Sequence, residues 1–139
     1  MPSDDSLAWA QRLLRLNTVS RESNLELIEC IADHLRALGV PLRLTYDQTR
    51  RKANLFATLG QGKPDGVILS GHTDTVPWDG QAWTREPLGA AVEGAKLYGR
   101  GSADMKSYIG LAVAQAEHYL EADLPHAIHY AFSHDEETG

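Results

Sequence analysis

Three short segments carry the side chains that could do chemistry. The first is SGHTDTVP, in which His72 and Asp74 stand two residues apart soon after the apolar run VIL. The second is GRGSADMK, which contains Asp104, and the third is HDEETG, which contains Glu136 and Glu137. Imidazole nitrogens and carboxylate oxygens are the donors that zinc and related divalent cations take from proteins. One interpretation of these segments is therefore a metal centre.

In this interpretation each residue type has a task. If extended backbone continued from His72 through Asp74, the carboxylate could accept the imidazole N–H and leave the other ring nitrogen for a metal. Asp104 precedes a predicted helix, whose backbone N–H groups and dipole would keep the carboxylate ionised. Glu136 and Glu137 are adjacent, so extended backbone would point them apart. That arrangement suits one glutamate as a metal ligand and the other as a proton carrier.

Each segment also has a plainer explanation. A His-x-Asp pair after a strand is common by chance. An aspartate before a helix is often a simple N-cap, and paired glutamates in a loop often form a solvated acidic patch. All three segments, however, fall at the ends of predicted elements, and ligands collect at the carboxyl ends of strands in open α/β sheets. Their joint occurrence favours the metal site.

The elements that must position these segments follow from hydrophobic periodicity. Helices are predicted in segment 3–16, where Ser3 and the aspartates offer caps, and in segment 23–38, where Ser23 and Glu26 have capping-box spacing. A third helix is predicted to begin after Asp104 and to continue to Leu120. The remaining pattern predicts strands at 41–46, 53–59, 66–70 and 127–133, and a hairpin around Glu93 and Gly94. Helices before and between strands predict an α/β fold with a mixed open sheet and flanking helices.

Composition and charge limit the possible functions. A chain of 139 residues, 42% of them hydrophobic, suits one domain with a substantial core. The net charge of -6 argues against nucleic acid or an anionic membrane as the partner. The first ten residues are acidic where a secretory signal needs basic residues, and no apolar run approaches the length of a membrane span. A cytoplasmic location is expected, with Cys30 as a core thiol.

In this order, GHTDTVP, GRGSADMK and HDEETG resemble the motifs of the zinc-dependent deacylases. This family includes acetylornithine deacetylase, succinyl-diaminopimelate desuccinylase, aminoacylase and related carboxypeptidases. The segments RKANLFATLG and HTDTVPWDGQAWTREPLG are most similar to the acetylornithine deacetylase branch. The resemblance implies hydrolysis of the N-acetyl amide of N-acetyl-L-ornithine to ornithine and acetate, a step of arginine biosynthesis.

The resemblance also implies a role for each site residue. It implies two divalent metal ions, most often zinc, with cobalt as a substitute. His72 would bind one metal, Glu137 would bind the other, and Asp104 would bridge both. Asp74 would orient His72, and Glu136 would act as the general base. The chain departs from the pattern after Asp-Met-Lys, where it has a serine and the family usually has glycine.

Finally, the resemblance implies that residues 1–139 are the N-terminal portion of a zinc-peptidase-like catalytic domain. Family members continue further, with more metal ligands and a lid domain through which they often form homodimers. With two protein ligands per metal, one of them shared, the chain is expected to bind metal weakly and to have little or no activity. Two alternatives stay open. One is a desuccinylase or an aminoacylase-like or carboxypeptidase-like hydrolase, again with a small N-acyl amino acid as substrate; the other is a non-catalytic remnant or an interaction module.

Overall fold

The computed structural model describes residues 4–139, so the predicted Ser3 cap lies outside the described residues. The elements are, in chain order, α1 (Asp4–Leu14), α2 (Leu25–Ala37), β1 (Leu42–Tyr46), β2 (Ala53–Leu59), β3 (Asp65–His72), β4 (Ala91–Glu93), β5 (Lys96–Tyr98), α3 (Lys106–Ala114), α4 (Ala116–Glu121), β6 (Ala127–Ser133) and the 3₁₀ turn η1 (Glu136–Thr138). Strands β2 and β6 have the predicted bounds. No helix within residues 4–139 has the length and apolarity needed to cross a membrane.

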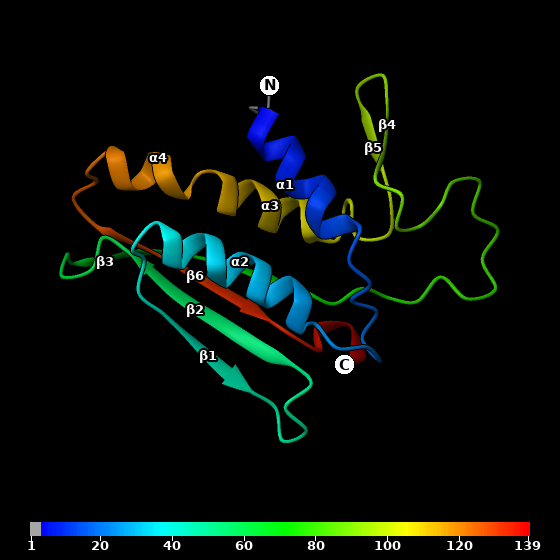
Figure 1. Ribbon diagram of the computed structural model, residues 1–139, viewed down its shortest axis with the longest axis horizontal. Coiled ribbons are helices and arrows are strands. Elements are labelled where there is room, and N and C mark those ends of the chain that lie inside the picture. Colours follow the sequence, from blue (N-terminus) through cyan, green and yellow to red (C-terminus); the bar gives the residue numbers. More distant parts are fainter. Residues whose placement is uncertain (1–3) are drawn as a thin grey trace.

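The main sheet has four strands in the order β1-β2-β6-β3, and a separate hairpin pairs β4 with β5. β2 runs antiparallel to both β1 and β6, whereas β3 and β6 are parallel. The predicted mixed α/β sheet is thus confirmed. Because β3 and β6 run in the same direction, their last residues, His72 and Ser133, are paired at one end of the sheet. In Figure 1 the β4–β5 hairpin stands away from the sheet, while η1 follows β6 at this end.

The hydrophobic core lies between one face of the sheet and the helices. Alternate residues of β2 are buried on this face, as the period of two in a strand requires. Tyr130 and Phe132 of β6 pack in the same core as Ile31 of α2 and Ile109 of α3. The other face lacks such cover within the described residues. It exposes Ile68 of β3 and, on β2, Phe56, whose ring stacks on the imidazole of His129 in β6.

Gly110 allows helix α3 to pack close to α1. A Cβ atom at Gly110 would lie 2.8 Å from the backbone nitrogen of Ala10, so only glycine allows this approach of the two backbones. At the first residue of α3, the buried Lys106 donates from Nζ to the carbonyl oxygen of Leu16 at 2.5 Å, just beyond the end of α1. A cation is favourable at the carboxyl end of a helix, although burial lowers the pKa of Lys106 to about 8.

Two details of the helices differ from the prediction. The capping box is wrong, because the N-cap of α2 is Asn24; the Ser23 hydroxyl accepts the N–H of Leu25 at 3.2 Å and donates to the carbonyl of Arg51. The Asn24 amide is also used elsewhere, since it exchanges two hydrogen bonds of 2.9 Å with the backbone of Ala53 at the start of β2. The predicted third helix is divided at Gln115, whose N–H is shared between two carbonyls of the preceding turn. Periodicity alone does not reveal such a local tightening.

Candidate functional site

The three polar segments meet at the carboxyl ends of β3 and β6. His72 is buried at the end of β3, and its Nε2 lies 2.9 Å from Oδ1 of Asp104. The same nitrogen lies 3.6 Å from Oε2 of Glu136, in the turn that follows β6. The predicted convergence is therefore confirmed for these three residues. It arises from the parallel pairing of β3 with β6 and from the loop that leads into α3.

The ring of His72 is oriented by Asp74. Nδ1 lies 2.9 Å from the backbone carbonyl oxygen of Asp74 and 3.3 Å from its Oδ1. Strand β3 ends at His72, the Asp74 carboxylate lies on the imidazole side as the spacing suggested, and the nearer acceptor is the Asp74 carbonyl. The 2.9 Å contact of Nε2 with the Asp104 carboxylate needs a proton on Nε2, and loss of that proton leaves the Nε2 lone pair for a cation. Burial by itself lowers the pKa of His72, but hydrogen bonds to Asp104 and Asp74 outweigh it and raise the pKa overall.

The buried carboxylate of Asp74 has a second task that the sequence did not reveal. Oδ1 accepts the backbone N–H of Glu136 at 3.1 Å, and Oδ2 accepts that of Glu137 at 3.0 Å. Oδ2 also accepts the hydroxyl of Ser20 at 2.5 Å. A buried carboxylate needs such donors to offset the loss of its hydration. Asp74 therefore fixes the backbone that carries both glutamates.

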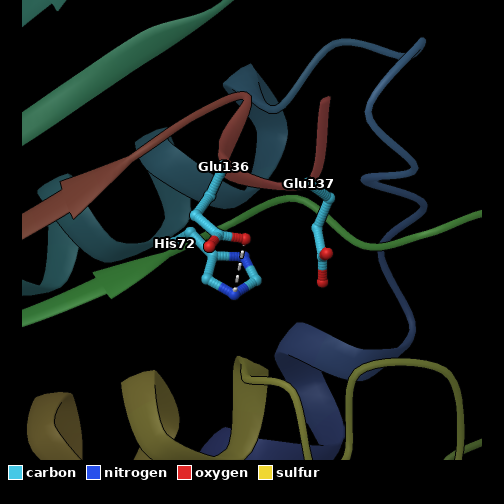
Figure 2. A group of neighbouring side chains, drawn as sticks. All are labelled: His72, Glu136 and Glu137. Carbon is cyan, nitrogen blue, oxygen red and sulfur yellow. Dashed lines mark ion pairs between the residues drawn. The ribbon is translucent and has the colours of Figure 1, made fainter. Parts of the chain in front are cut away.

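Glu136 and Glu137 lie in the 3₁₀ turn η1, so the assumption of extended backbone is wrong. The turn lets both side chains approach His72 (Figure 2), and the potential ligand atoms of the three residues all lie within 4.8 Å of one another. Partial burial raises the pKa of Glu137, and the negative charge of Asp104 adds to the rise. The carboxylates are thus crowded together, and a cation among them would relieve their repulsion.

Asp104 stands at the exposed side of this group, with 71% of its side chain accessible. The N-cap of α3 is Met105, and within the described residues no side chain caps this helix. Both the simple N-cap explanation and the expected hold by helix N–H groups are therefore wrong. Asp104 and Glu137 instead line a common depression together with Val76 and the loop 99–103. The peptide bond between Asp104 and Met105 is cis.

Two further residues of this region were missed by sequence reasoning. Asp135 precedes Glu136 with φ 62°, and its carboxylate is paired with the Lys52 ammonium. Lys52 also donates to the carbonyl oxygen of Ser20 at 2.5 Å. The hydrogen bond from Lys52 holds the pKa of Asp135 below its usual range. Lys52 lies 83 positions before Asp135, and no local motif announces such a pair.

Known relatives resemble this chain in both sequence and structure. Residues 68–139, just over half of the chain, match the peptidase family M20/M25/M40. The chain is 39% identical over 118 residues to acetylornithine deacetylase of Proteus mirabilis and 37% identical to that of Shigella sonnei. Each match covers 84% of this chain, which spans 30% of the length of those relatives.

Solved structures of longer proteins share the fold. The M20 family metallo-carboxypeptidase Sso-CP2 from Sulfolobus solfataricus superposes with a TM-score of 0.83 at 20% identity, over 98% of this chain and 32% of its own. Human carnosine dipeptidase 1 superposes with a TM-score of 0.81 at 25% identity, over 98% and 33%. The sequence match spans all three polar segments of the site. The chain belongs to the peptidase family M20/M25/M40, a family of metal-dependent hydrolases.

Proposed function

We propose that residues 1–139 are the N-terminal portion of the catalytic domain of an amidohydrolase that converts N-acetyl-L-ornithine to ornithine and acetate. One observation carries the chemistry: Nε2 of the buried His72 faces Asp104 and Glu136 where β3 and β6 end. The substrate is suggested by the sequence similarity to acetylornithine deacetylases. The wider proposal is a cytoplasmic homodimer that acts on a small molecule rather than on nucleic acid or a membrane.

The donor set fits a divalent metal. One imidazole nitrogen and carboxylate oxygens converge, and the ring is already oriented by Asp74 through its other nitrogen. In our proposal His72, Asp104 and Glu137 are the metal ligands, and zinc or cobalt suits such donors. His72 and Asp104 would hold one ion, and Asp104 and Glu137 would hold the other, so each ion would have two protein ligands where catalytic zinc has three. Further ligands would come from beyond the described residues.

The side chains have complementary tasks in the proposed reaction. Bound divalent ions would polarise the amide carbonyl and lower the pKa of a water molecule. Glu136, exposed beside His72, would accept a proton from the water that attacks the carbonyl carbon. As the carbon–nitrogen bond breaks, Glu136 would return the proton to the departing amine. Asp74 would take no part in bond making but would hold His72 and the backbone of Glu136 in place.

A cobalt titration of the 139-residue chain tests the metal site. We expect weak binding of Co²⁺, accompanied by visible absorption bands, because few protein ligands are present. His72→Ala should abolish these bands, whereas His118→Ala, which removes an exposed histidine of α4, should preserve them. Equal binding by the wild-type chain and His72→Ala would overturn the proposed site.

The substrate needs a separate test, because the structural neighbours include a carboxypeptidase and a dipeptidase. The full-length gene product would be assayed on N-acetyl-L-ornithine, N-succinyl-diaminopimelate and a dipeptide. Preference for the first supports the deacetylase. Preference for another substrate favours the desuccinylase or peptidase alternative, and metal binding without hydrolysis of any of them favours a non-catalytic remnant or interaction module.

A further inference from the structure

A closed ring of contacts surrounds the backbone of the two glutamates. Lys52 pairs with the carboxylate of Asp135, and the next residue, Glu136, donates its N–H to Asp74. Asp74 accepts the hydroxyl of Ser20, and the carbonyl of Ser20 accepts from Lys52. The ring joins segments from four parts of the chain. It has one cation, Lys52, and two carboxylates.

We propose that Lys52 is a positioning residue that holds Glu136 and Glu137 in place for metal binding. This inference rests on the proposed function, because it concerns how the same site is kept in shape. Lys52 touches none of the proposed metal ligands and acts through Asp135 and Ser20. Asp135 directly precedes the turn η1, and the hydroxyl of Ser20 donates to Asp74. Asp74 in turn accepts the backbone N–H of Glu136.

The surroundings of Lys52 distinguish its ion pair from an ordinary surface pair. Its side chain is only 18% exposed and that of Asp135 is 35% exposed. Lys52 also has a second acceptor, the Ser20 carbonyl, so its ammonium position is defined from two sides. Lys63 also has a second acceptor, the Leu124 carbonyl, but its ion pair differs from that of Lys52 because the Asp123 side chain is 89% exposed. Exposed pairs of that kind contribute little to the structure around them.

The backbone conformation of Asp135 explains why its ion pair with Lys52 matters for the turn η1. Its φ of 62° lies in the left-handed region. Aspartate adopts this region more readily than most residues but less readily than glycine. The turn η1 begins directly after this residue. Pairing Asp135 with Lys52 favours this backbone conformation, and the conformation places the N–H groups of Glu136 and Glu137 on Asp74. Loss of the lysine would therefore loosen η1 before it affected the core.

Hydrogen exchange on the metal-free chain tests this without any assumption about metal. Lys52→Met removes the charge and keeps the apolar stem, and we expect faster exchange at the amides of Glu136 and Glu137 but not at Tyr130 in the core. Lys52→Arg, which keeps the charge, should restore protection, and Lys63→Met should have no effect. Unchanged exchange at both glutamates would overturn the inference. Equal acceleration at Tyr130 would overturn it as well, because Lys52 would then be a general stabilising residue.

Cobalt affinity supplies the second readout. Lys52→Met should weaken Co²⁺ binding about tenfold, as loss of an outer partner of a metal site does, and Lys52→Arg should recover most of it. Wild-type affinity in Lys52→Met would overturn the inference. If the wild-type chain binds no cobalt, the proposed function fails, and the exchange comparison still decides whether Lys52 positions the turn.

Discussion

The two ends of the main sheet use polar residues in different ways. At the carboxyl ends of β3 and β6, Asp74 is buried and accepts three hydrogen bonds, from Ser20 and two backbone N–H groups. At the opposite end, Lys63 pairs with an exposed Asp123. Buried polar groups are costly unless every bond is made, whereas exposed ion pairs hardly affect stability. The site end should thus be intolerant of substitution and the other end tolerant.

The largest effect is expected from Asp74→Ala. The change leaves two backbone N–H groups and the Ser20 hydroxyl without their acceptor, and we expect a loss of about 3 kcal/mol in the free energy of unfolding. Urea denaturation measures this loss. Asp65→Ala, at the opposite end of the sheet, is the control because its carboxylate is exposed. Similar losses in the two variants would contradict the proposed contrast between the ends.

A smaller loss is expected from Asn24→Ala, which removes the buried amide that joins α2 to β2. Three hydrogen bonds of 2.9 Å disappear, two with Ala53 and one with Thr73, and about 2 kcal/mol should be lost. Thermal unfolding would compare this variant with Gln48→Ala, which truncates an exposed side chain in the β1–β2 turn. An unshifted midpoint for Asn24→Ala would show that the amide merely fills space.

Ser107→Ala is expected to be an exception among substitutions at the site end of the sheet. The serine there is expected to lower the stability of the chain, so its removal should raise it. Its Oγ is buried and has no hydrogen-bond partner among the described residues. Replacing the hydroxyl by hydrogen should stabilise the chain by up to about 1 kcal/mol, since an unsatisfied polar atom is removed. A higher midpoint in urea is the expected result. A lower midpoint would mean that the hydroxyl has a partner after all.

The smallest effect is expected from Asp123→Asn. The hydrogen bond from Lys63 lowers the pKa of Asp123, so any contribution to stability exists at neutral pH and fades as the carboxylate is protonated in acid. Since the group is exposed, solvent screens the pair and no measurable change in the melting temperature is expected at pH 7. A clear drop in melting temperature at pH 7 would remove the distinction between the two ends.

The sequence predicted the main elements well because their signals are local. The alternation of ANLFATL and the apolar run AIHYAFS each define a strand, and the residues that follow β3 and β6 had to meet once those strands paired in parallel. The convergence of His72, Asp104 and Glu136 was accordingly predictable. The roles assigned to these residues stay predictions until metal binding is measured.

What the sequence could not predict depends on contacts between distant segments. Glu136 and Glu137 form a 3₁₀ turn because Asp74 accepts both of their N–H groups, a contact across more than 60 positions. Asn24 is the N-cap of α2 but its side chain makes no capping bond, because its amide is bonded to the backbone of Ala53 at the start of β2. Neither the turn η1 nor the hydrogen bonds between Asn24 and Ala53 produce a periodic signal in the sequence.

The uncovered sheet face has a practical consequence. Among the described residues β3 has β6 as its sole neighbour in the sheet, so one side of its backbone is free, and Ile68 and Phe56 are exposed. A free strand edge beside exposed apolar side chains favours edge-to-edge association between molecules. The isolated chain is therefore expected to aggregate as its concentration rises. Measurements on dilute samples would separate this non-specific association from a specific oligomer.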